Sequence, residues 1–402
     1  MFLISLTLGL GVNVGLALQH SYTALLTLRC FQSIGSSGAM VISSATVADL
    51  VTRAERGKYL AYSSLGSTLG PAVGPVLGGV LTKFLGWRSV FWFLAIFTGV
   101  MLFFILCFMR ETCRAVVGNG SIPPQSWNKP LILELVSPRS FENPDYETRL
   151  VLPSEDNKRG FFSQILLGAL DGLKMILTKP VNLLVLCSTV IYCGFMAVMS
   201  SIPALLQQKY HFNPLQIGLC YLPFAAGGFA SRWTIGSLAD WNFRRHGRQV
   251  GIEVQRNQQT RKQLLQIPLE KVRLQLVLPL VYFSCLVLLG YSWAMNYNVH
   301  ISCLLIMLFL LGNAFVGMNN MIVALLIDLN ASRPATAVAG MNMYRFLVGA
   351  GAVAAVLPLV HVVGIGWVGT IIAGLWFLAS SGLWLIYSRG HAWRLKSQSV
   401  LA

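Results

Sequence analysis

The sequence contains ten apolar runs, each about the length that a helix needs to cross a lipid bilayer. A bilayer admits only structures that satisfy their backbone hydrogen bonds internally, and runs of this length favour helices over the shorter strands of a barrel. Only 11% of the residues are charged, whereas a soluble domain carries about a quarter. We therefore expect an all-α polytopic membrane protein, with spans at residues 2–19, 21–47, 61–84, 88–110, 181–206, 214–239, 274–295, 300–327, 336–362 and 366–389.

The longest polar segment covers residues 111–180 and contains most of the prolines that lie outside the apolar runs. Its acids and bases are scattered in mixed order, which is typical of a partly disordered linker. It divides the chain into a bundle of four helices at residues 1–110 and a bundle of six helices at residues 181–389. A short polar tail, 390–402, follows.

The basic residues are distributed unevenly between the two ends of the spans. The chain has a formal net charge of +16, which alone could indicate a nucleic-acid partner. Most of the Lys and Arg residues, however, lie in alternate connections, after the second, fourth, sixth and eighth runs, and in the tail. This is the positive-inside pattern, which predicts that both termini are cytoplasmic and that nucleic acid is not a partner.

A glycine recurs at every fourth position between residues 66 and 78, so that one face of a helix carries four glycines. In water such a helix would be unfavourable, because each interior glycine costs about 1 kcal/mol and each proline about 3 kcal/mol relative to alanine. In lipid, small residues let two helices approach closely, and proline bends a helix. We interpret the stretch as a hinge, although a tightly packed helix would show the same pattern. The hinge residues are Gly70, Gly74, Pro75, Gly78 and Gly79.

Two arginines lie inside apolar runs together with amide side chains. Arg29 is about two turns inside the second run and is followed by Gln32; Asn342 and Arg345 are neighbours on the ninth. An arginine at this depth is costly, which favours a functional role, although a long side chain can also reach the interface. Asn313 and Asn320 share a face of the eighth run and would serve either as ligand contacts or as hydrogen bonds between helices.

The sequence offers no catalytic centre. The six His residues are scattered, and seven of the eight Cys residues lie in apolar runs without metal-ligand spacing. A disulfide framework, a metal, a cofactor and an enzymatic activity are therefore not expected.

Two motifs of the first half resemble those of the major facilitator superfamily, specifically its drug:proton antiporters with twelve spans. The pattern of Arg29, Gln32 and Gly35 resembles the fourth-helix motif R-x-x-Q-G-x-G, with Ser33 in place of the first glycine. Residues 70–79 match the fifth-helix antiporter motif G-x-x-x-G-P-x-x-G-G in full. The family associates that motif with export.

The second half extends the resemblance over essentially the whole chain. Residues 236–245, with Asp240 as the acid, resemble the family's loop motif G-x-L-A-D-x-x-G-R-R. Glu111–Arg114 and Pro268–Leu274 are similar to segments of the fungal quinidine-resistance type. If Arg29 belongs to the fourth helix of the family, the first two helices and the first-half loop motif are absent from this chain.

The resemblance implies a multi-pass protein of the plasma membrane, monomeric, that exports small organic molecules such as drugs or secondary metabolites against protons by alternating access. The expected coupling residues are Arg29, Gln32, Asp240 and Arg345. Candidate cavity residues, chosen from the polar side chains of the spans, are Tyr192, Tyr221, Asn313, Asn320 and Asn342.

Two other functions remain open. The chain could export organic anions such as di- or tricarboxylates, in which case Arg29 and Arg345 would bind the carboxylate directly. Alternatively, a chain without the first two family helices would be a non-transporting fragment. The bilayer, a small-molecule substrate and protons are the expected partners of a working transporter.

Overall fold

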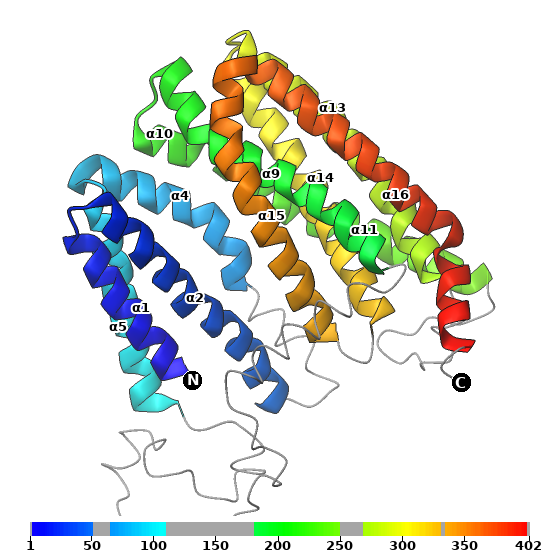
Figure 1. Ribbon diagram of the computed structural model, residues 1–402, viewed down its shortest axis with the longest axis horizontal. Coiled ribbons are helices and arrows are strands. Elements are labelled where there is room, and N and C mark those ends of the chain that lie inside the picture. Colours follow the sequence, from blue (N-terminus) through cyan, green and yellow to red (C-terminus); the bar gives the residue numbers. More distant parts are fainter. Residues whose placement is uncertain (1, 51–64, 110–180, 250–267, 331–333, 400–402) are drawn as a thin grey trace, which may run out of the picture. The chain divides into compact units, whose positions relative to one another are not determined.

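The computed structural model describes residues 2–50, 65–109, 181–249, 268–330 and 334–399, and every regular element in these ranges is a helix (Figure 1). The chain separates into two compact units, residues 1–157 and 158–402, which are described one at a time. The predicted linker at 111–180, including Glu111–Arg114, lies outside the described residues.

The first unit contains four described helices: α1 (Phe2–Leu18), α2 (Tyr22–Leu50), α4 (Leu65–Leu85) and α5 (Arg88–Phe108). Helix α1 packs against both α2 and α5, and its Val12 and Leu16 form a small core with Phe91 of α5. A side chain at Gly35 of α2 would place its Cβ 3.2 Å from the Ser5 carbonyl oxygen of α1. The glycine therefore allows the two backbones to approach, and the Ser5 hydroxyl donates a hydrogen bond to the Gly35 carbonyl.

The second unit contains the remaining helices. They are α9 (Val181–Tyr210), α10 (Pro214–Leu219), α11 (Leu222–Gln249), α13 (Leu269–Asn296), α14 (Ile301–Leu329), α15 (Pro334–Val363) and α16 (Ile365–Ser399). Helix α13 packs along α14 and α16, while α11 packs against α14 and α9 against α15 and α16.

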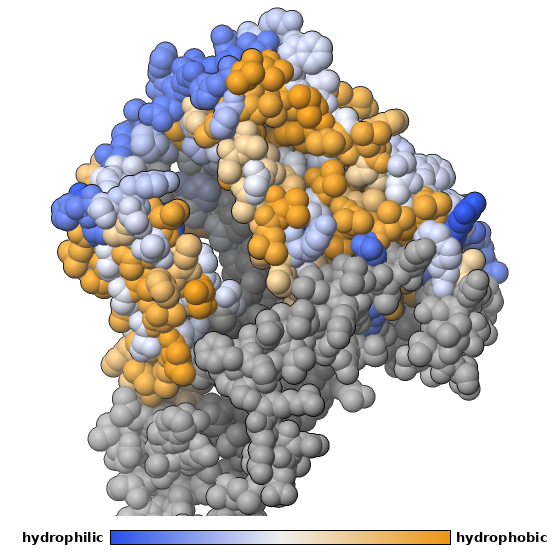
Figure 2. Space-filling model, in the orientation of Figure 1, coloured by the Kyte–Doolittle hydropathy of each residue, from blue (hydrophilic) through white to orange (hydrophobic). Residues whose placement is uncertain are grey.

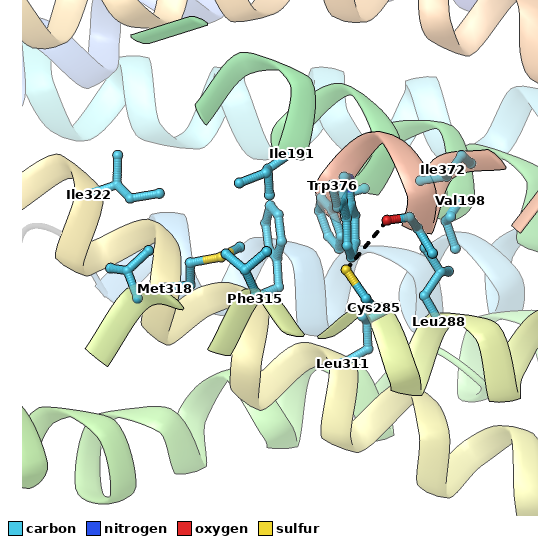
Figure 3. Close-up of a cluster of buried hydrophobic side chains, with 14 of the residues drawn as sticks. Ile191, Val198, Cys285, Leu288, Leu311, Phe315, Met318, Ile322, Ile372 and Trp376 are labelled. Carbon is cyan, nitrogen blue, oxygen red and sulfur yellow. Dashed lines mark hydrogen bonds between the residues drawn. The ribbon is translucent and has the colours of Figure 1, made fainter. Parts of the chain in front are cut away.

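The core of the second unit is formed where α9, α13, α14 and α16 meet (Figure 3). Trp376 of α16 is completely buried and lies close to Gly194 of α9. Phe315 of α14 stacks on Phe195 of α9 with ring centroids 3.7 Å apart. The Cys285 thiol, also drawn in Figure 3, donates to the Ala373 carbonyl at 3.5 Å.

The structure confirms the predicted helical fold but divides one of the predicted spans. Residues 214–239 were expected to form a single helix, but the chain turns at Cys220 and Tyr221, between α10 and α11. The physical reason is Pro223, which has no N–H and would clash with the carbonyl of Leu219 in a continuous helix. Helices α11 and α16 each continue ten residues beyond the predicted ends of their spans, to Gln249 and Ser399, so α16 extends into the predicted tail.

Among the described helices, six are long and apolar enough to cross a membrane: α5, α9, α13, α14, most of α15 and α16 up to Gly390. Helix α1 and the second half of α4 are apolar but shorter. Hydrophobic side chains cover the visible flanks of the helices, and hydrophilic ones gather at helix ends (Figure 2). Helices α2 and α11 are the more polar ones, and they carry two of the sequence motifs.

Candidate functional sites in the two helical units

A chain of polar side chains crosses the first unit at the depth of Arg29. The Arg29 guanidinium donates from Nη1 to Gln32 Oε1 at 3.0 Å, and Gln32 Nε2 donates to Asn13 Oδ1 at 2.6 Å. The Arg29 Cζ atom also lies 4.8 Å from the centroid of the Phe91 ring. Within the described part of the chain, the Arg29 guanidinium on α2 is therefore contacted by neutral groups only: it has a hydrogen bond to Gln32, which is in turn bonded to α1, and a cation–π contact with α5.

This arrangement brings together two of the predicted residues and adds a third. Arg29 and Gln32 are one turn apart on α2, so their contact follows from the helical spacing. Asn13 was not selected from the sequence, although it is an amide side chain inside an apolar run. It is 5% exposed and fixes the orientation of the Gln32 amide.

The glycine face of α4 is open rather than tightly packed. Apart from the neighbouring backbone of α4 itself, no atom of the described residues lies within 4 Å of a Cβ built at Gly70, Gly74 or Gly78. Pro75 is partly buried and Gly79 is buried. Close packing within the described part of the chain therefore does not explain these three glycines, and the hinge remains a prediction.

The other unit holds a cation that, unlike the exposed Arg29, is buried. Arg345 of α15 is 3% exposed, and its Nη1 atom donates to Asn319 Oδ1 of α14 at 3.0 Å. The Arg345 Cζ atom lies 5.4 Å from the ring centroid of Tyr192, and the Cys193 thiol donates to the Arg345 carbonyl at 3.9 Å. The Nε atom finds no hydrogen-bond partner among the described residues. The partners seen are neutral, as they are for Arg29.

The other predicted cavity residues are dispersed. Asn313 of α14 pairs with Thr234 of α11, with Nδ2 and Oγ1 3.2 Å apart, and thus joins two helices. The Tyr221 hydroxyl donates to the Met199 carbonyl at 2.8 Å. Asn320 is exposed and Asn342 partly buried, and the structure gives neither a hydrogen bond among the described residues. Of the five predicted cavity residues, the one placed beside Arg345 is Tyr192.

Charged groups of the second unit collect near one end of α11 and α13. Asp240 is exposed on the last turns of α11, close to several arginines of the same helix. Arg273 of α13 forms an ion pair with Asp328 of α14, with the N and O atoms 3.4 Å apart. Glu270 is fully buried at the start of α13, and the sequence reasoning did not select it. No group of three metal-ligating side chains occurs among the described residues.

Comparison with known proteins agrees with this architecture. Residues 1–355 match the model of the Major Facilitator Superfamily. The chain is 39% identical over 393 residues to the MFS-type transporter clz19 of Cochliobolus lunatus, with 98% of this chain and 72% of that protein aligned. It is 28% identical to the multidrug transporter QDR2 of Candida glabrata, over 98% of this chain and 69% of the relative.

A solved structure shows the same fold at much lower sequence identity. The crystal structure of the human organic anion transporter MFSD10 superposes with a TM-score of 0.55 at 17% identity, covering 95% of this chain and 76% of that one. From the family match, the transporter relatives and the apolar helices together, the chain belongs to the Major Facilitator Superfamily and is a multi-pass membrane transporter, not an enzyme.

Proposed function

We propose that this transporter exports small organic molecules, such as drugs or secondary metabolites, in exchange for protons, as an antiporter of the quinidine-resistance type. The observation that carries the proposal is the hydrogen-bonded chain of Arg29, Gln32 and Asn13. Polar and ionisable groups at membrane depth are costly and mark paths for ions or solutes. The export direction is supported by the full match of residues 70–79 to the antiporter motif.

Proton exchange supplies enough energy for useful export. One proton moving through about 100 mV provides about 2.3 kcal/mol, and one pH unit adds about 1.4 kcal/mol. Together they sustain a concentration ratio of several hundred for an exchanged neutral solute. In this proposal the protein alternates between two states that open to opposite sides of the membrane, and the α4 glycines, with Pro75, act as the hinge.

The proposed placement is the plasma membrane, with both termini in the cytoplasm and one chain as the working unit. The orientation of the termini is supported by the concentration of Lys and Arg in alternate connections. In this orientation the Arg273–Asp328 pair and the last turns of α11 lie at the cytoplasmic end of the second unit.

The test is transport by the purified 402-residue chain in proteoliposomes, with the fluorescent dye rhodamine 6G as probe. An imposed pH gradient should drive dye movement, and Arg29→Ala should reduce the initial rate at least tenfold. Arg389→Ala removes an exposed arginine of α16 and serves as the control with the same charge change. Dye movement that ignores the pH gradient in the wild type would rule out proton coupling for this substrate.

A second candidate function is the export of organic anions, and the environment of Arg345 favours it. This guanidinium is buried, yet the contacts described for it come from Asn319 and Tyr192, which are neutral. A carboxylate on the solute would give the cation a charged partner. Citrate in the same liposome assay separates the candidates, because citrate movement by the wild type that Arg345→Gln abolishes is expected only of an anion exporter.

A further inference from the structure

The last three turns of α11 carry a hollow with a strongly basic lining. Its volume is about 610 Å³. The six described lining residues recur every three or four positions, so they occupy one side of the helix: Ser237, Asp240, Trp241, Arg244, Arg245 and Arg248.

The opposite side of α11 is anchored, which fixes the direction of this lining. The Asn242 side chain is buried and donates from Nδ2 to the Val272 carbonyl of α13 at 2.9 Å. Ala239 is buried as well, and the Phe243 ring centroid lies 5.7 Å from Arg273 Cζ. Helix α11 is thereby held with its basic side turned away from the core of the unit.

The three lining arginines are exposed and keep most of their donors available. Among the described residues, Arg244, Arg245 and Arg248 have no hydrogen bond or ion pair. One of the three contacts an aromatic ring: the Arg245 Cζ atom lies 5.6 Å from the centroid of the Trp241 ring. Asp240 is the one acid of the described lining. The hollow therefore carries an excess of positive charge in a form suited to bidentate binding of phosphate.

An apolar track continues from the hollow along the same helix. Trp241 is 57% exposed and Leu238 is 46% exposed, and Trp233, about two turns before Trp241, is 72% exposed. Exposed tryptophans next to arginines are typical of the membrane–water interface, where the ring sits at the level of the headgroups. A ligand suited to both parts would combine a phosphate with hydrocarbon chains.

We propose that this hollow binds the headgroup of an anionic phospholipid such as phosphatidylserine. The arginines contact the phosphate and carboxylate oxygens, Trp241 lies beside the glycerol, and the acyl chains follow Leu238 and Trp233. The site rests on one element of the proposed function, namely that this end of α11 faces the cytoplasm, where the anionic lipids of a plasma membrane are concentrated. It is independent of what the protein transports.

The experiment measures lipid binding directly, without transport. Purified protein in detergent is titrated with phosphatidylserine or phosphatidylcholine, and native mass spectrometry counts the bound lipids. The test variant is Arg244→Gln with Arg248→Gln. The matched control is Lys271→Gln with Arg389→Gln, which removes the same charge from exposed residues of α13 and α16.

We expect the wild type to prefer phosphatidylserine to phosphatidylcholine. A basic residue near an anionic membrane contributes about fivefold in binding, so the test variant should bind phosphatidylserine more than tenfold more weakly, with phosphatidylcholine binding unchanged. The control should resemble the wild type. If the double variant does not insert, the single Arg244→Gln and Arg248→Gln variants should each show about a fivefold loss.

Three results would overturn the proposal. One is unchanged phosphatidylserine binding in a test variant that inserts and melts as the wild type does. Another is an equal loss in the control, since binding would then reflect overall charge. The third is binding of soluble glycerophosphoserine as tightly as the intact lipid, which would make the hollow a site for a dissolved phosphate ester.

Discussion

At the residue scale, the contact between Asn319 and Arg345 makes a sharp prediction. Asn319→Ala removes the amide oxygen that accepts from the buried guanidinium, and we expect the free energy of unfolding to fall by about 1–3 kcal/mol. Thermal denaturation in detergent gives the measurement. Asn320→Ala is the matched control, because the neighbouring side chain is exposed and its removal should change stability by less than about 0.5 kcal/mol. Equal losses in the two variants would show that the Asn319 contact has no special importance.

These two neighbours also show what the sequence can predict about the site. The contact between Arg29 and Gln32 follows from helical spacing, because both residues are on one helix. The sequence analysis chose Asn320 as a cavity residue and not Asn319. Residue spacing shows which side chains share a face of one helix, but it does not show how that helix is rotated against its neighbours. That rotation is set by the packing of side chains such as Phe315 and Met318, which becomes visible only in the assembled unit. Contacts between helices, such as Gln32 with Asn13, were inaccessible for the same reason.

At the element scale, the glycines of α4 differ in their surroundings from those of α11 and α14, although all of them lie in helices. Helices α11 and α14 cross at Gly227 and Gly312, where an added Cβ would collide with the backbone oxygens of Phe309 and Phe224, respectively. The open glycines of α4 have no such neighbour among the described residues. The apolar pattern predicted the existence and bounds of most helices closely, but it did not identify which glycines permit a crossing.

We therefore expect alanine substitutions to separate the two kinds of glycine. Gly227→Ala should lower the free energy of unfolding by about 1–3 kcal/mol, because a backbone oxygen cannot yield as a side chain does. Gly74→Ala should leave it unchanged or raise it by up to about 1 kcal/mol, through better helix propensity, while slowing dye transport in liposomes if α4 is a hinge. Normal transport by a stable Gly74→Ala variant would contradict the hinge.

At the scale of the whole molecule, the alternation of basic and non-basic connections should determine the orientation of every helix. The ten predicted spans correspond to described helices, with one of them divided at Cys220 and Tyr221. An even number of crossings returns the chain to the side on which it began. The side of the membrane on which a helix end lies determines the orientation of the helices before and after it. The location of both termini can therefore be tested by labelling single positions near helix ends.

Gln208→Cys, near the end of α9, and Gln249→Cys, at the end of α11, provide the pair of test positions, because both side chains are exposed. Both are made with the exposed Cys30 and with Cys113 of the predicted linker replaced by Ser, to remove their background. A membrane-impermeant maleimide should label Gln208→Cys in intact cells, whereas Gln249→Cys should be labelled only after permeabilisation. The reverse pattern would place the termini outside. It would also move the basic end of α11 to the outer leaflet, where anionic phospholipids are scarce, so this measurement tests the orientation on which the lipid site depends.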